Sequence, residues 1–93
     1  MDKMQKLEAM DKILRELEDL KNSETSVLKK TAQIEAENIN LNIGLLDKRL
    51  PDIHDFADQS VDAIDALMAA FIDHRDTFVK DNDLGTKQEE ANI

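Results

Sequence analysis

Only three residues of this chain strongly disfavour the interior of a helix, and their positions constrain the fold more than any other feature. They are Gly44, Pro51 and Gly85. Proline fits the first turn of a helix, and glycine fits just past the end of one. The sequence therefore predicts an all-α fold, an antiparallel helical hairpin of two long helices over residues 3–49 and 51–82.

The turn of this hairpin is expected at about residues 44–51. Residues 1–84 form a single domain in this interpretation, and residues 85–93 are expected to be a flexible polar tail. A chain of 93 residues buries only about 60 to 65% of its unfolded surface. Two helices alone shield only one stripe each, so the hairpin is expected to associate into an oligomer or with a partner.

A break in the first helix is the alternative. Residues 22–26 are rich in asparagine, serine and threonine, which favour turns over helix interiors. A break there would give a three-helix bundle. We favour a continuous helix, because the apolar spacing crosses the segment from Leu20 to Val27 without losing phase and no capping box marks a new start.

Apolar residues recur every seven positions along the first helix, as is typical of a coiled-coil seam. The principal series is Ile13, Leu20, Val27, Ile34 and Leu41, and the companion positions are Met10, Leu17, Glu24, Thr31, Asn38 and Leu45. Three companion positions are polar. Two interpretations stay open: polar groups buried in the seam that fix its register, or a frayed seam in which these groups contact water.

A second apolar stripe lies near the turn, almost opposite the principal series. A helix that is apolar on two sides needs two neighbours. One neighbour is the second helix, and the other is expected to come from another chain. The residues of this stripe that we expect to bind a partner are Ile39, Ile43, Leu46 and Leu50.

The second helix is expected to open at Pro51 and to bury one face with steps of three and four residues. This face comprises Ile53, Phe56, Ala57, Val61, Ile64, Leu67, Met68, Phe71, Ile72, Phe78 and Val79. Arg75 falls in the middle of it. We expect its side chain to extend toward solvent, with a pair to Glu8 or Asp11 as the alternative.

Aspartates line the opposite side of the second helix, and no lysine or arginine occurs between Pro51 and His74. The net charge of -9 is concentrated here, because residues 1–50 carry nine basic and ten acidic side chains against three and eleven in residues 51–93. The stripe is either a solvated face or a docking surface for a basic partner. Its members are Asp55, Asp58, Asp62, Asp65, Asp73 and Asp76.

Several classes of function are disfavoured. Cysteine is absent, and no serine has the sequence context of a catalytic nucleophile, so we expect neither an enzyme nor a cofactor. His54 and Asp58 offer only two ligands to a metal ion, and native metal binding is not expected. Direct nucleic-acid binding needs clustered cations. No apolar run is long enough to span a membrane and no secretory signal is evident, so a cytoplasmic protein is expected.

Three functions compete. The first is a protein–protein interaction module, such as an adaptor, assembly or regulatory protein, that packs helices with itself or with a partner. The second is an inhibitor whose aspartates resemble DNA phosphates to a basic nucleic-acid-binding protein. The third is export: the length and shape are similar to those of the Trp-x-Gly hairpin proteins of type VII secretion. In this comparison Asn42-Ile43-Gly44 would occupy the position of the Trp-x-Gly turn. Tryptophan is absent from the chain, so membership of that family is not inferred.

Overall fold

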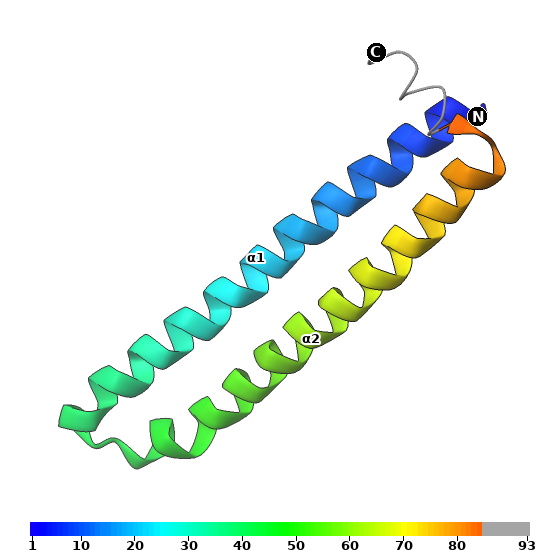
Figure 1. Ribbon diagram of the computed structural model, residues 1–93. Coiled ribbons are helices and arrows are strands. Elements are labelled where there is room, and N and C mark those ends of the chain that lie inside the picture. Colours follow the sequence, from blue (N-terminus) through cyan, green and yellow to red (C-terminus); the bar gives the residue numbers. More distant parts are fainter. Residues whose placement is uncertain (85–93) are drawn as a thin grey trace.

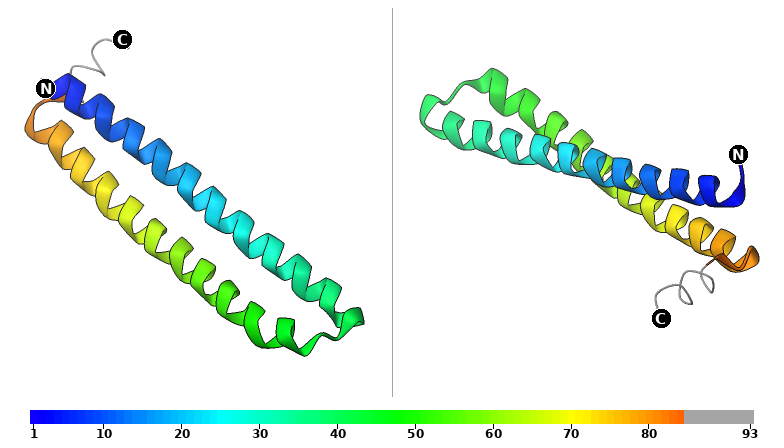
Figure 2. Two further views of the ribbon diagram at one scale, coloured as in Figure 1. Left: turned by 180° about the vertical axis from the view of Figure 1, so that it is seen from behind. Right: turned by 90° about the horizontal axis from the view of Figure 1, so that it is seen from above.

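The computed structural model describes residues 1–84, which form two long antiparallel helices. Helix α1 spans Lys3–Leu41 and helix α2 spans Gly44–Asp81. The helices run side by side along their whole length, with the N-terminus beside the end of α2 (Figure 1). They cross at a shallow angle when seen from above (Figure 2), as helices with seven-residue spacing do. The predicted all-α helical hairpin is confirmed. In this part of the chain neither helix is long and apolar enough to cross a membrane.

Helix α1 begins with a capping box and is unbroken. The Asp2 carboxylate accepts a hydrogen bond from the Gln5 backbone N–H at 2.8 Å, and the Gln5 side chain accepts one from the Asp2 N–H at 3.0 Å. Residues 22–26 remain helical, so the hairpin is not broken into three helices there. Their hydroxyl groups donate to carbonyls one turn back, as Thr25 does to Lys21 at 2.9 Å. The helix continues through this segment, although hydrogen bonds of this kind slightly weaken a helix.

The contact between the helices, which we call the seam, uses a different stripe of α1 from the one that the sequence favoured. The principal series faces outward: Ile13 and Leu20 are 43% and 47% exposed. The companion positions from Met10 to Asn38 face α2 together with Leu7, Leu14 and Leu28, whereas the companion Leu45 lies on α2 itself and is exposed. The seam consists of Leu7, Met10, Leu14, Leu17, Lys21, Glu24, Leu28, Thr31 and Asn38 on α1, and Leu50, His54, Ala57, Val61, Ile64, Met68, Phe71, Arg75 and Phe78 on α2.

The polar companion positions are therefore inside the contact. Thr31 is 4% exposed and Asn38 only 1%, while Glu24 is half-buried. The Thr31 hydroxyl donates to the Val27 carbonyl at 2.8 Å, which satisfies it within its own helix. Of the two interpretations, burial of polar groups in the seam is confirmed for Thr31 and Asn38.

The turn is shorter than predicted, and Pro51 does not open the second helix. Asn42 closes α1 in the left-handed conformation (φ 54°), which asparagine tolerates better than most residues. Ile43 follows in an extended conformation, and α2 starts at Gly44. Pro51 lies inside α2, where its missing N–H leaves the Asp47 carbonyl without a helical donor. The first helix therefore ends eight residues earlier than predicted, at Leu41 with Asn42 as its cap, and the second begins seven residues earlier than predicted.

Asn38 holds this turn together. Its side-chain amide donates to the Ile43 carbonyl at 3.1 Å and to the Asp47 carboxylate at 2.8 Å. Its side-chain oxygen accepts the Ile43 N–H at 2.9 Å, and its backbone carbonyl accepts the Asn42 N–H at 2.7 Å. A buried amide with three side-chain hydrogen bonds fixes both the path of the turn and the rotation of α1 about its axis.

The buried face of α2 is narrower than predicted. Ile53, Phe56, Leu67 and Ile72 are exposed, Phe56 by 68%. The predicted face combined two adjacent stripes, and one neighbouring helix can cover only one of them. In the described residues the apolar side chains that are nearly fully buried are Leu7, Met10, Leu50, Ala57, Ile64 and Leu84.

The open end of the hairpin closes around the last described residue. Leu84 is buried and borders a hollow with Asp2, Lys3 and Met4 of the first turn of α1. The Lys6 ammonium lies 5.3 Å from the centre of the Phe78 ring. The tail expected over residues 85–93 lies outside the described residues.

Gly44 is a site at which a substitution should stabilise the hairpin. It is helical, its φ is not positive, and a Cβ there would meet nothing within 4 Å. Gly44→Ala should raise the free energy of unfolding by about 0.4–1 kcal/mol, because alanine restricts the unfolded chain. Urea unfolding followed by circular dichroism measures this. Asn42→Ala is the matched control and should lose stability, because its backbone is left-handed; a destabilised Gly44→Ala would contradict the turn described here.

Removal of the Asn38 side-chain amide should change the free energy of unfolding by more than Gly44→Ala does, and in the opposite direction. Asn38→Ala deletes three hydrogen bonds and leaves the Ile43 N–H without its partner, so the free energy of unfolding should fall by about 2–3 kcal/mol. Asn40→Ala, at an exposed position two residues away, should change it by less than about 0.5 kcal/mol. Equal effects of the two substitutions in the same urea experiment would show that Asn38 does not hold the turn.

Candidate interaction surfaces

The seam divides the surface of the hairpin into two broad faces. A residue one position before a seam residue lies about 100° to one side of it, and a residue one position after lies about 100° to the other. Because the helices are antiparallel, the "before" positions of α1 and α2 share one face, and the "after" positions share the opposite face. By this rule most of the exposed large apolar side chains lie on one face, whereas Ile39 and Ile72, which directly follow seam residues, lie on the other.

One face carries large apolar side chains from both helices. Ile13, Leu20 and Val27 each precede a seam residue of α1, and Ile53 and Leu67 each precede a seam residue of α2. All five are at least 40% exposed. Together with their neighbours at the turn and on the outer side of α2 they form what we call the apolar face: Ile13, Leu20, Val27, Leu41, Ile53, Phe56 and Leu67.

The opposite face is acidic. Asp58 and Asp65 directly follow seam residues of α2, Asp55, Asp62 and Asp76 lie in the next row outward, and Asp73 lies at the outer edge. All six aspartates of the predicted stripe are exposed. Two of them have cationic neighbours. The Lys21 ammonium is 2.8 Å from the Asp65 carboxylate, and the Arg75 guanidinium is 3.3 Å from that of Asp76. The hydrogen bond from Lys21 to Asp65 raises the pKa of Lys21.

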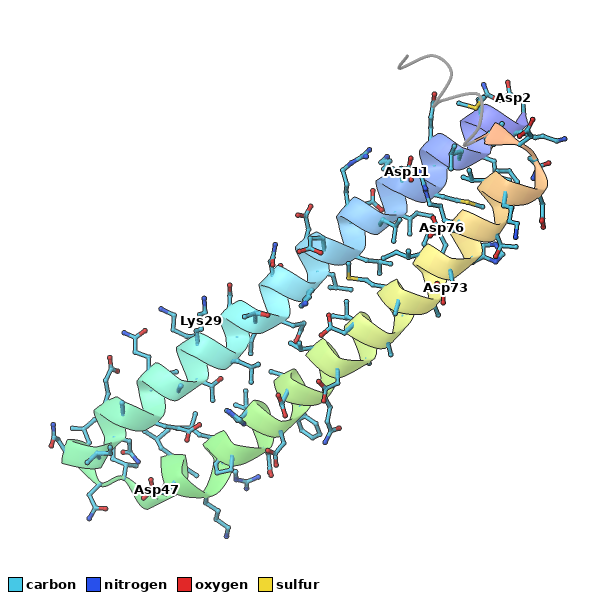
Figure 3. The ribbon with its side chains drawn as sticks, viewed as in Figure 1. Asp2, Asp11, Lys29, Asp47, Asp73 and Asp76 are labelled. Atoms are coloured by element: carbon cyan, nitrogen blue, oxygen red, sulfur yellow. The ribbon has the colours of Figure 1, made fainter. Side chains whose placement is uncertain are left out.

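An ion pair joins the helices on this face near the open end. Arg75 donates to both oxygens of Asp11, from Nε at 2.7 Å and from Nη2 at 3.4 Å. Figure 3 places Asp11 on α1 at the same end as Asp76 on α2. The hydrogen bond to Asp11 raises the pKa of Arg75. The second of the two sequence interpretations, pairing with Asp11, is therefore correct, and extension of Arg75 into solvent is wrong.

The predicted partner-binding residues near the turn do not form one surface. Leu50 is buried in the seam and Leu46 is half-buried, whereas Ile39 is 78% exposed and Ile43 is 43% exposed. Ile39, Leu46 and Leu50 border a shallow hollow of about 420 Å³ with Ala36 and Pro51. Ile39 directly follows Asn38, so it lies on the acidic side of the hairpin.

The structure offers no cluster of chemistry-bearing side chains in residues 1–84. In this range no three histidine or acidic side chains converge closely enough to hold a metal ion. The Nδ1 of His54 lies 3.8 Å from the Asp55 carboxylate rather than beside Asp58. The candidate functional features are therefore surfaces: the apolar face, the acidic face and the hollow beside the turn.

Comparison with known proteins does not assign the chain to a family. No protein-family model matches the chain, and neither the curated proteins nor the solved structures show a significant match.

Sequence reasoning missed the apolar face, although its signal was present. The seven-residue series from Ile13 to Leu41 was read as the contact with the second helix. The leucines at positions 7, 14 and 28 form another seven-residue series, interrupted only by Lys21, and this series is in the seam. Two adjacent stripes in one helix predict two contacts, and only one of them is satisfied within the hairpin.

The Arg75–Asp11 pair should show measurable coupling. Both side chains are partly exposed, so solvent screens the pair and a coupling of about 0.5–1 kcal/mol is expected. A double-mutant cycle with Asp11→Asn and Arg75→Gln, measured by urea unfolding, isolates it. The control cycle uses Asp62→Asn in place of Asp11→Asn, and in it the changes in the free energy of unfolding should be additive. Additivity in both cycles would contradict the pair.

Proposed function

We propose that this chain is a protein–protein interaction module of the cytoplasm, an adaptor, assembly or regulatory protein that acts by binding and not by catalysis. It packs helices, with itself or with another helical protein, through the apolar face. The observation that supports this proposal most strongly is the alignment of exposed large apolar side chains from both helices on one face. An exposed apolar patch of this extent marks an interaction site in soluble proteins.

The composition of the seam strengthens the proposal. Three of the four seam residues in the middle of α1 are polar, namely Lys21, Glu24 and Thr31 beside Leu28, while leucine, isoleucine and valine lie on the apolar face. Full burial of one such side chain contributes about 1.5–3 kcal/mol. A hairpin that leaves these residues half exposed gains only part of that energy, and a partner helix laid along the apolar face supplies the remainder.

An acidic inhibitor of a basic protein remains the second candidate. The six exposed aspartates of α2 favour it, because they form a long stripe on a face that is free of large apolar side chains over most of its length. Binding through this stripe would weaken steeply with added salt. The cations already beside Asp65 and Asp76 reduce its negative potential, so we place this candidate second.

Three variants distinguish these surfaces in a capture experiment. The tagged chain is incubated with a lysate of its source cells at two salt concentrations, and captured proteins are identified by mass spectrometry. The apolar-face variant is Leu20→Glu with Leu67→Glu, the acidic-face variant is Asp58→Asn with Asp62→Asn, and the turn variant is Ile39→Glu. All these positions are exposed, so each variant should keep the helical content of the original chain.

We expect the apolar-face variant to capture at least ten-fold less partner protein than the original chain. The acidic-face and turn variants should capture as much as the original chain at both salt concentrations. Loss in the turn variant alone would assign binding to the hollow beside Ile39. Loss in the acidic-face variant, together with release by salt, would replace the proposed function with the acidic inhibitor.

A further inference from the structure

The apolar face has the dimensions of a stable protein interface. From Ile13 to Leu41 the α1 row extends about 42 Å at 1.5 Å per residue. Two packed helices are about 18–20 Å wide, so the face measures about 760–840 Å². Standard interfaces bury about 800 Å² on each partner. The area of the whole apolar face therefore equals the area that one subunit contributes to a standard interface.

We infer that a second copy of this chain covers the apolar face, side by side with the first and with both turns at the same end, to form a four-helix bundle. This inference rests on the proposed function and names the partner. The twofold axis of this dimer runs parallel to the helices. Each α1 then packs on the α2 of the other copy as well as on its own.

The register of the hairpin determines which residues would meet. Three contacts between the helices join residues at the same level: Asp11 with Arg75, Lys21 with Asp65, and Asn38 with Asp47. Residues of α1 and α2 are thus level when their numbers add to about 86. A twofold axis parallel to the helices preserves these levels between copies. The apolar rows then meet level by level, with Leu20 beside Leu67 and Ile34 beside Ile53 of the second copy.

The outer rows of the two helices differ, and this difference favours a contact between α1 and α2 of different copies. Beside the apolar face, the outer row of α1 carries Glu16, Ser23, Lys30 and Glu37, whereas the outer row of α2 carries Arg49, Phe56, Ala63 and Ala70. Each row repeats every seven residues, three positions after the row that contains Ile13 on α1 or Ile53 on α2. All eight side chains are exposed. One row is mostly charged and the other is mostly small or apolar, so they complement each other better than either complements itself.

The same-end arrangement places favourable partners together along these rows. Lys30 is level with Phe56 of the second copy, where an ammonium group over an aromatic ring is attractive. Glu37 is level with Arg49 of the second copy, which gives an ion pair of opposite charges. Ala63 and Ala70 are small enough to let the opposing α1 approach closely.

Packing with the turns at opposite ends is less favourable. It would lay α1 against α1 of the second copy, with Val27 at the centre. Glu16 would then lie beside Glu37, two like charges at the edge of the contact, and Lys30 would lie beside Ser23. Like charges placed together across an interface oppose binding.

The distribution of charge also allows two copies of an acidic chain to associate. Each chain carries a net charge of -9, and the stripe from Asp55 to Asp76 lies on the side away from the apolar face. In the dimer these stripes point outward on opposite sides of the bundle, so the strongest charges stay in water and far apart. A partner of opposite charge would instead be drawn to the acidic face and would leave the apolar face uncovered.

The absence of cysteine from the sequence permits a test by engineered disulfides. The variant with Lys30→Cys and Phe56→Cys has its two thiols on opposite outer edges of one hairpin, too far apart to pair within a chain, but they meet across the same-end dimer. The matched variant has Ser23→Cys and Lys30→Cys, which would meet only with the turns at opposite ends. All three positions are exposed in the hairpin, so folding is not at risk.

Mild oxidation should convert the Lys30→Cys, Phe56→Cys variant to a covalent dimer at least ten-fold faster than the matched variant. Light scattering of the original chain should give twice 10.6 kDa, and Leu20→Glu with Leu67→Glu should return it to 10.6 kDa. Faster cross-linking of the matched variant would overturn the orientation. If the original chain is a monomer at about 100 μM, the inference that a second copy is the partner is wrong. Capture of another protein through the apolar face would in that case still support the proposed function.

Discussion

The rotation of α1 about its own axis is the constraint on which the rest of this structure depends, and Asn38 sets it. A buried amide must keep its hydrogen bonds, because an unpaired polar group in this position costs more than a modest apolar contact returns. The bonds of Asn38 to Ile43 and Asp47 are available only when Asn38 faces the turn. With Asn38 in the seam, every seventh residue back to Met10 follows it there, and the series from Ile13 to Leu41 turns outward.

The outward series gives the molecule its asymmetry. One face of the hairpin displays leucine, isoleucine, valine and phenylalanine, and the other displays aspartates, the cations that pair with some of them, and the isoleucines Ile39 and Ile72. The pairs Lys21–Asp65 and Arg75–Asp11 both cross the seam on the acidic side, where water screens them. They help to hold the register of the hairpin without covering the apolar side. Most of the exposed apolar side chains are therefore separated from most of the negative charge.

The fold could be predicted to a large extent from local chemistry. Scarcity of glycine and proline indicated long helices, and residues 22–26 are helical although their side chains favour turns. The end of the first helix was misplaced because asparagine can adopt a left-handed conformation that is usually assigned to glycine. The start of the second helix was misplaced because proline usually lies in the first turn of a helix, whereas Pro51 lies inside α2.

The candidate surfaces were harder to predict, because periodicity records how many apolar stripes a helix has but not which neighbour each one meets. The sequence determined two adjacent seven-residue stripes on α1, the acidic stripe of α2 and the hairpin itself. Only the tertiary structure decided that Leu7, Leu14 and Leu28 face α2 while Ile13, Leu20 and Val27 face outward. That choice depends on hydrogen bonds between Asn38 and a turn whose geometry forms only when both helices are in place, and so no single helix encodes it.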